Sequence, residues 1–268
     1  MKGRLNWPVT VLLCWVLLTL GGLSSVFEPN RIDLPRILEP PSIANLLGTD
    51  ELGRPVLDRL LSGAGVSLLV ALISVVVSAS IGITIGLVAG YFGGWIDRII
   101  SRVIEVFLAF PGLLLAIAMA AMIGPGIDNV IIALSVMGWV GYARLVRVQV
   151  LALRHREHIQ AAVALGQPDW IILRRHLLPL VMAPVWVEAS FGVASAVIAE
   201  AGLSFLGLGV QPPAASWGAM IRDGVRYLLV APHLVLAPGV ALFLVVMAAN
   251  VLGDQLRDRL DVTSHSRR

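Results

Sequence analysis

Residues 157–184 read EHIQAAVALGQPDWIILRRHLLPLVMAP, and this stretch decides how the rest of the chain is arranged. It places a cluster of charged side chains between two apolar segments, each long enough to span a membrane. Residues 157–165 favour a helix, Gly166 suits the position after a helix C-terminus, and Pro168 with Asp169 suits the first turn of a second helix. The stretch therefore predicts a helix, a sharp corner and another helix. An ordinary charged loop is the alternative interpretation of these residues taken alone.

The composition of the chain indicates an integral membrane protein. Of its 268 residues, 57% are hydrophobic and 14% are charged, a balance that does not fit a soluble domain. The apolar runs are continuous rather than alternating, which favours membrane helices over a barrel. The single cysteine, Cys14, excludes an intrachain disulfide, and the single lysine, Lys2, excludes a P-loop of the G-x-x-x-x-G-K-[ST] type. If ATP drives this protein, a partner must bind the nucleotide.

The apolar runs predict an all-α protein with about six transmembrane helices. We expect a first helix at 1–27, an extracytoplasmic and interfacial segment at 28–65, a five-helix core at 66–252 with a loop at 150–180, and a tail at 253–268. A cleaved signal peptide is the alternative for the first segment, but its apolar run is longer than a usual signal core, so we favour an uncleaved span. The second helix is expected at about 66–90, and the third at about 103–123 with a kink at Pro111.

The basic residues predict the orientation of these spans. Lys2 and most of the arginines fall in one alternating set of polar segments, which includes the loop at 150–180 and the C-terminal tail. The arginines of the other set are largely offset by acidic residues. Since cytoplasmic segments carry the excess of basic residues, we expect the loop and both termini in the cytoplasm.

Small residues recur at every fourth position of the second predicted helix. They are Ser74, Ser78, Gly82, Gly86 and Gly90. This spacing puts them on one helix face, where small side chains let a neighbouring membrane helix approach closely. The ladder therefore predicts helix packing rather than chemistry.

Three motifs resemble those of a known family. Gln160-Ala161-Ala162, three residues, Gly166, nine residues and then His176-Leu177-Leu178-Pro179 resembles the "EAA" loop, E-A-A-x3-G-x9-I-x-L-P, of ABC-importer permeases. The stretches G-T-D-E-L-G-R at 48–54 and A-E-A-G-L-S-F-L-G-L-G at 199–209 resemble the peptide/nickel branch of these permeases. Gln160 replaces the usual Glu and His176 the usual Ile. An amide offers only a neutral hydrogen bond, so no salt bridge is expected from position 160.

The resemblance implies the second or "C"-type permease subunit of an ABC importer for di- or oligopeptides, in the bacterial inner membrane. The implied partners are a second related permease, two ATPase subunits that bind ATP and Mg, and an extracytoplasmic solute-binding protein; no cofactor is expected in this chain. The loop would dock on an ATPase subunit through Gln160, Ala161, Ala162, Gly166, Asp169, Leu178 and Pro179. A nickel-chelate importer is the alternative within the family, and a channel or structural membrane subunit without ATP coupling is the alternative outside it.

Two acidic residues, Glu188 and Glu200, lie inside a predicted span. A carboxylate in hydrocarbon is costly and usually faces a cavity or a partner, so we expect both on or near the translocation pathway. A hydrogen-bonded structural acid at a subunit interface is the alternative for Glu200. His155, Glu157 and His158 lack the i, i+4 histidine spacing of zinc sites, which favours a solvated basic loop. We find no catalytic constellation and expect no metal site.

Overall fold

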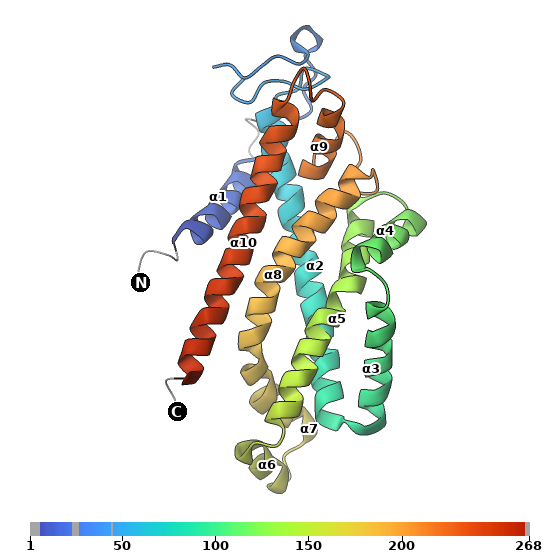
Figure 1. The fold of residues 1–268 in the computed structure, drawn as a ribbon, viewed down its shortest axis with the longest axis vertical. Coiled ribbons are helices and arrows are strands. Elements are labelled where there is room, and N and C mark those ends of the chain that lie inside the picture. The colour runs from blue at the N-terminus through green and yellow to red at the C-terminus, as the bar shows by residue number, and fades with distance from the viewer. Residues whose placement is uncertain (1–5, 23–26, 44, 266–268) are drawn as a thin grey trace.

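One long helix, α2 (Val56–Phe92), runs through the molecule, and the other helices pack around it (Figure 1). The computed structural model describes residues 6–22, 27–43 and 45–265. At 1.5 Å per residue α2 is about 55 Å long, well beyond the ~30 Å hydrocarbon core. The predicted start near residue 66 was wrong. The helix begins directly after Pro55, where the Val56 N–H donates to the Gly48 carbonyl at 3.0 Å, so residues 56–65 of the segment expected to be interfacial belong to the same helix.

In the described part of the chain, the other elements are helices and helical turns that pack around α2. The remaining elements are α1 (Asn6–Gly22), a 3-10 turn (Leu34–Arg36), α3 (Gly94–Leu108), α4 (Gly112–Ile123), α5 (Ile127–Leu153), α6 (Glu157–Ala164), α7 (Asp169–Ile171), a π-helical turn (Ile172–Leu177), α8 (Leu178–Phe205), α9 (Trp217–Val225) and α10 (His233–His265).

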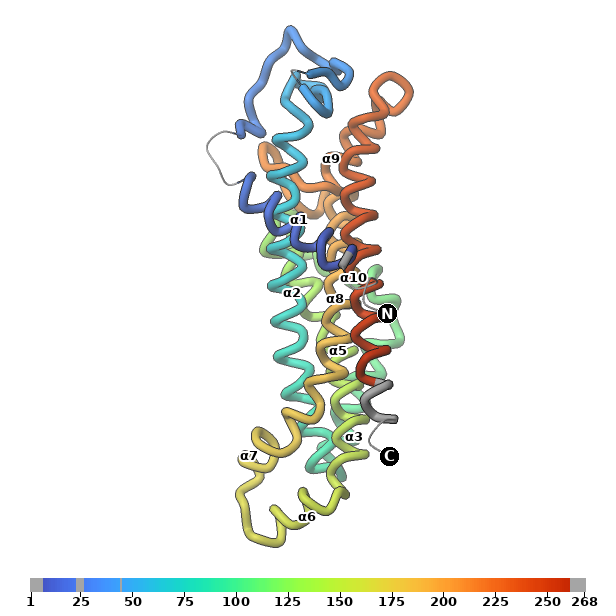
Figure 2. The backbone as a smooth tube through the Cα atoms, turned by 90° about the vertical axis from the view of Figure 1, so that its left-hand side faces the viewer, coloured from blue at the N-terminus to red at the C-terminus, as the bar shows by residue number. Residues whose placement is uncertain are grey.

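The molecule has two distinct ends. α6 and α7 lie at one end, and α9 lies at the other together with the polar segment that precedes α2 (Figures 1 and 2). We call these the α6 end and the α9 end.

The helices confirm an all-α membrane protein, but they differ in whether each is long enough to cross a membrane by itself. α2, α5, α8 (with the turns from Asp169) and α10 are long and apolar enough to cross a membrane, and α3 with α4 forms a fifth span if this bent pair is counted as one. α1 is apolar but has only 17 residues. Residues 1–5 and 23–26 of the predicted first span lie outside the described residues. In the expected tail from residue 253, residues up to His265 are helical, because α10 continues without a break to that residue.

The predicted kink at Pro111 is a complete break. α3 and α4 are separated by residues 109–111 and meet at 84°. Pro111 has φ −58° and ψ 120°, so it caps α4 instead of continuing α3. Proline lacks an N–H and disfavours the helical conformation of the residue before it, which is sufficient to end a helix that no packing forces to continue. The expected single helix at 103–123 is therefore two helices, the first of which begins at Gly94.

The small-residue ladder lies against α5. A Cβ at Gly82 would come 2.5 Å from the Trp139 carbonyl oxygen, and one at Gly86 would come 2.6 Å from the Ala143 carbonyl oxygen. The Ser78 hydroxyl donates to the Ser135 carbonyl across the same interface at 3.3 Å. Because these contacts reach the partner helix backbone, α2 and α5 can lie this close only where their shared face has small side chains.

Two tryptophans attach α1 and α9 to α2. The Trp15 indole N–H donates to the Ala64 carbonyl at 3.1 Å, and the Trp217 indole N–H donates to the Leu60 carbonyl at 3.0 Å. The two rings lie 6.0 Å apart. Both polar N–H groups are thus satisfied while the large apolar rings fill the space between three helices.

The G-T-D-E-L-G-R stretch forms a compact polar cluster at the start of α2. Asp50 accepts hydrogen bonds from the Leu52 and Arg54 backbone N–H groups, both at 2.9 Å, and from Arg54 Nε at 2.7 Å. Arg59 Nε lies 3.4 Å from the same carboxylate. Asp50, Arg54 and Arg59 are all buried, so the stretch anchors the α9 end of α2.

Candidate functional site

α6 ends in a tight corner at Gly166. The backbone there has φ +72°, the Gly166 N–H donates to the Val163 carbonyl at 2.9 Å, and the Gln167 N–H donates to the Ala162 carbonyl at 3.1 Å. This pair of bonds is the Schellman motif, which requires a left-handed residue that glycine adopts at little cost. Pro168 then precedes α7. The predicted helix, corner and helix are therefore present.

The corner has one buried and one exposed face. Ile159 and Ala162 are 1% and 4% exposed and pack toward the π-helical turn. Gln160 and Ala161 point to the other side and are exposed, as are Asp169 and Pro179, whereas Leu178 is half-buried. Leu165 and Trp170 flank the corner with 80% and 63% of their surfaces exposed. Large apolar side chains exposed at the tip of a polar corner are typical of a surface that binds another protein.

His176 has a structural role that the sequence pattern does not predict. Its ring Nε2 lies 3.0 Å from Gln167 Oε1, so the second helix holds the corner by a polar contact. His176 belongs to the π-helical turn, which lies just before Pro179. Pro179 has no N–H and its ring would clash with a carbonyl one turn earlier in a regular helix, and a widened turn relieves that clash.

One polar contact joins the corner to α2, and further polar contacts join α2, α3 and α5 to one another beside it. The Tyr91 hydroxyl of α2 donates to Asp169 Oδ1 at 2.7 Å, and Arg154 Nη1 donates to the Gly90 carbonyl at 3.2 Å. The Arg147 guanidinium of α5 makes two hydrogen bonds to the Asp97 carboxylate of α3. The corner thus contacts α2 directly, and the ends of α2, α3 and α5 are joined to one another next to it.

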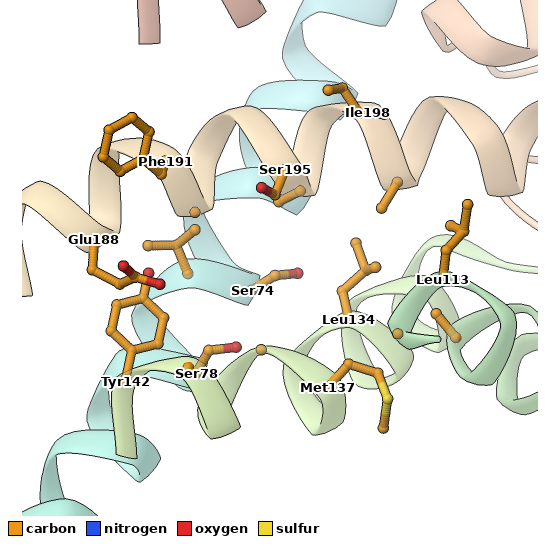
Figure 3. Close-up of a pocket in the computed structure, with 18 residues that line it drawn as sticks. Ser74, Ser78, Leu113, Leu134, Met137, Tyr142, Glu188, Phe191, Ser195 and Ile198 are labelled. Atoms are coloured by element: carbon orange, nitrogen blue, oxygen red, sulfur yellow. The ribbon is translucent and has the colours of Figure 1, made fainter. Parts of the chain in front are cut away.

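A cavity of about 530 Å³ lies between α2, α4, α5 and α8 (Figure 3). Its wall is mostly apolar, with the hydroxyl groups of Ser74, Ser78 and Ser195 and the side chains of Tyr142 and Glu188 facing it (Figure 3). Among the described residues that line it, Glu188 is the one charged side chain. The cavity can therefore take a small molecule and favours a cationic group over an anionic one.

Glu188 and Glu200 have different surroundings although both lie on α8. Glu200 is 1% exposed and does not line the cavity. Its carboxylate accepts hydrogen bonds from Ser67 of α2 at 2.9 Å and from Ser204 at 2.7 Å. Glu200 thus has the surroundings of a structural acid inside this chain, whereas Glu188 faces a space that a solute can enter.

The described residues contain no group of three or more His, Cys, Asp or Glu side chains that could hold a metal ion. His155, Glu157 and His158 are exposed, beside Arg156, in the predicted basic loop.

The family model described as "Binding-protein-dependent transport system inner membrane component" matches residues 82–262, more than half of the chain. This chain belongs to that family. The match extends from Gly82 in α2 to near the end of α10 and includes the corner and the cavity-lining residues of α4, α5 and α8, but not those of α2. Membership excludes the alternative of a channel or structural subunit outside the family.

Relatives of this permease are similar over most of its length. It is 46% identical over 232 residues to the glutathione transport system permease protein GsiD of Pectobacterium atrosepticum, covering 87% of this chain and 77% of that protein. The GsiD protein of Escherichia coli O1:K1 / APEC is 41% identical over the same lengths. A solved chain of the MetNI methionine ABC transporter in an inward-facing conformation has a TM-score of 0.61 at 23% identity, covering 76% of this chain and 97% of that one. That likeness concerns the fold alone.

Several residues of the permease that the sequence did not single out join distant segments. The Asp97–Arg147 pair joins residues 50 positions apart in the sequence, and the Ser67–Glu200 hydrogen bond joins residues 133 positions apart. Tyr142 lines the cavity with Glu188 from another helix. Short motifs and periodicity carry no signal for such pairs, because each depends on how two helices are placed.

Proposed function

We propose that this permease forms half of a translocation pathway for di- or oligopeptides and couples it to ATP hydrolysis by partner subunits. The observation that carries the proposal is the tight corner at Gly166, which exposes Leu165 and Trp170 at the α6 end. Glutathione, which two relatives are named for transporting, is peptide-like and supports the peptide class over a nickel chelate.

The partners follow from the same proposal. A second permease would complete the pathway, two ATPase subunits would bind ATP and Mg, and an extracytoplasmic binding protein would deliver the substrate. With Lys2 as its one lysine the chain has no P-loop, so we expect the isolated subunit neither to bind nor to hydrolyse ATP.

The proposed orientation puts the α6 end and both termini in the cytoplasm of a bacterium, with the α9 end outside. The corner and the residues around it carry Arg154, Arg156, Arg174 and Arg175, whereas the arginines of the polar cluster before α2 pair with Asp50 and Glu51. An excess of basic residues favours the cytoplasmic side.

Coupling would work through contacts that differ between the nucleotide states of the ATPase, because a partner shifts a conformational equilibrium only by its differential affinity. The exposed face of α6 supplies the contact surface, including Gln160 and Ala161. Tyr91, Arg154 and the Asp97–Arg147 pair then link the movement to α2, α3 and α5. Of these helices, α2 and α5 form part of the wall of the cavity.

Reconstitution tests this function. The permease is assembled in proteoliposomes with its partner permease, ATPase subunits and binding protein, and uptake of labelled glutathione, trialanine and a nickel chelate is measured with and without ATP. We expect ATP-dependent uptake of a peptide probe that also needs the binding protein. ATP-independent flux would contradict coupling, and uptake of the nickel chelate alone would favour the alternative substrate.

A further inference from the structure

The cavity between α2, α4, α5 and α8 contains polar groups without partners. The Tyr142 hydroxyl and the Ser74 hydroxyl have no hydrogen-bond partner among the described residues, although the two side chains belong to residues only 4% and 3% exposed. A buried hydroxyl without a partner is unfavourable, because it has lost its hydrogen bonds to water and gained none in the protein. Both groups face the same space, so a ligand in it can supply the missing hydrogen bonds (Figure 3).

The charged side chain that lines the cavity is negative. Figure 3 shows the Glu188 carboxylate beside the Tyr142 ring, and the described lining residues include no Lys, Arg or His. A carboxylate in a largely apolar cavity favours a positively charged neighbour. A hard metal ion needs several oxygen ligands, commonly with more than one carboxylate, whereas a monovalent cation can be balanced by one.

Small residues keep the space next to these polar atoms open. A Cβ at Gly192 would come 2.5 Å from the Tyr142 hydroxyl oxygen, and one at Gly141 would come 3.2 Å from Glu188 Oε1. Any larger side chain at these positions would fill the place next to both groups. The free volume of about 530 Å³ lies within the usual range of roughly 300–1,000 Å³ for small-ligand pockets.

We propose that this cavity binds a protonated amino group of the transported molecule, with Glu188 as counter-ion and the Tyr142 and Ser74 hydroxyls as hydrogen-bond acceptors. An ammonium group has three N–H donors, which match one carboxylate and two hydroxyl oxygens. This site rests on the proposed transport function and adds a feature of the substrate to it. A molecule whose amino group is blocked loses the charge and the donors at once.

The test uses a reporter thiol in the cavity. Ser195 lines it, is exposed, and follows Glu188 by two helical turns on α8, about 10 Å along the axis. Ser195→Cys is made in a Cys14→Ala background, which removes the one native cysteine. The full chain, assembled with its partner subunits in lipid nanodiscs, is treated at pH 7 with three methanethiosulfonates: 2-aminoethyl, 2-(trimethylammonio)ethyl and neutral methyl. The rate at which each reagent modifies Ser195→Cys is divided by the rate at which the same reagent modifies free cysteine, which corrects for its intrinsic reactivity.

We expect the 2-aminoethyl reagent to modify Ser195→Cys roughly tenfold faster than the neutral reagent, as a carboxylate about 10 Å away implies at an effective dielectric constant near 20. Glu188→Gln should abolish this preference, and Glu105→Gln, which alters an exposed acid outside the cavity, should leave it intact. The trimethylammonio reagent has the positive charge but no N–H donors, so it should modify Ser195→Cys more slowly than the 2-aminoethyl reagent does. When Tyr142→Phe is added, the two cationic reagents should react at the same rate.

Equal rates for the cationic and neutral reagents would overturn the proposal, and so would a preference that survives Glu188→Gln. A thiol at position 195 that no reagent modifies would show that solutes do not enter the cavity, with the same consequence. Equal rates for the two cationic reagents in the presence of Tyr142 would overturn the role of the hydroxyls. These rates need no transport, whereas failure of the proposed function would appear separately, as absent ATP-dependent uptake.

Discussion

Replacing Gly166 by valine should uncouple transport from ATP hydrolysis while the complex stays assembled. Gly166 has φ +72°, and a Cβ there would have no atom within 4 Å, so the substitution adds backbone strain without a steric clash. A side chain in the left-handed region costs roughly 1–2 kcal/mol, and a β-branched one more. Since 1.4 kcal/mol is a factor of ten, the native corner should become at least about tenfold less populated relative to rearranged ones.

The assay is substrate uptake measured together with ATPase activity in reconstituted complexes, with assembly checked by co-purification. Gly124→Val is the matched control: Gly124 also has a positive φ, +107°, and no atom within 4 Å of an added Cβ, but it lies in the α4–α5 turn. Gly166→Asn, which tolerates the left-handed region better, should recover part of the coupling. Normal ATP-dependent uptake by an assembled Gly166→Val complex would refute the reasoning, as would equal uncoupling by Gly124→Val.

Three further results are expected. Gly86→Ala pushes α2 away from α5 and should lower the free energy of unfolding of the permease by about 1–3 kcal/mol. Gly202→Ala, where a Cβ meets nothing within 4 Å, should be neutral or slightly stabilising. Equal effects of the two substitutions on thermal unfolding would contradict the packing account. Glu200→Ala should lower thermal stability by about 2–4 kcal/mol and Glu200→Gln by much less, because the former leaves two serines without their acceptor; lost transport at unchanged stability would instead indicate a pathway role. Cysteine labelling should modify Ala214→Cys from outside the cell and Gln167→Cys only from inside, and outside labelling at 167 would overturn the orientation.

Local sequence signals predicted the corner because its geometry is local. The left-handed turn needs glycine, and the next helix begins after proline, so Gly166 and Pro168 together determine both helix ends. Hydropathy likewise predicted where the apolar helices lie, since burial in lipid requires continuous apolar runs.

The prolines show that local signals do not determine every helix break. Pro111 breaks its helix, yet Pro184 and Pro238 lie inside α8 and α10, which remain continuous. Each proline loses the same N–H, so the outcome depends on packing along the rest of the helix. Val181 and Val185, on either side of Pro184, are buried among residues of α2 and α5. Leu234, one turn before Pro238, is buried among residues of α2. This packing holds both helices through their prolines.

The two acids of α8 show the same limit for the candidate site. Sequence alone places Glu188 and Glu200 equally inside a span. Their surroundings differ because Ser67 of α2 and Ser204 supply donors to Glu200, while Gly141 and Gly192 leave room beside Glu188 and Tyr142. That difference depends on helix rotation, which a single-helix pattern does not specify.

Photo-crosslinking from two exposed leucines tests most directly whether the corner docks on the ATPase. Leu165 at the corner is 80% exposed, and Leu229, between α9 and α10 at the opposite end, is 99% exposed. With p-benzoylphenylalanine at each position of the assembled importer, we predict that position 165 crosslinks to an ATPase subunit and that position 229 does not. Crosslinking of the ATPase from position 229, with none from position 165, would contradict both the docking surface and the orientation of the permease.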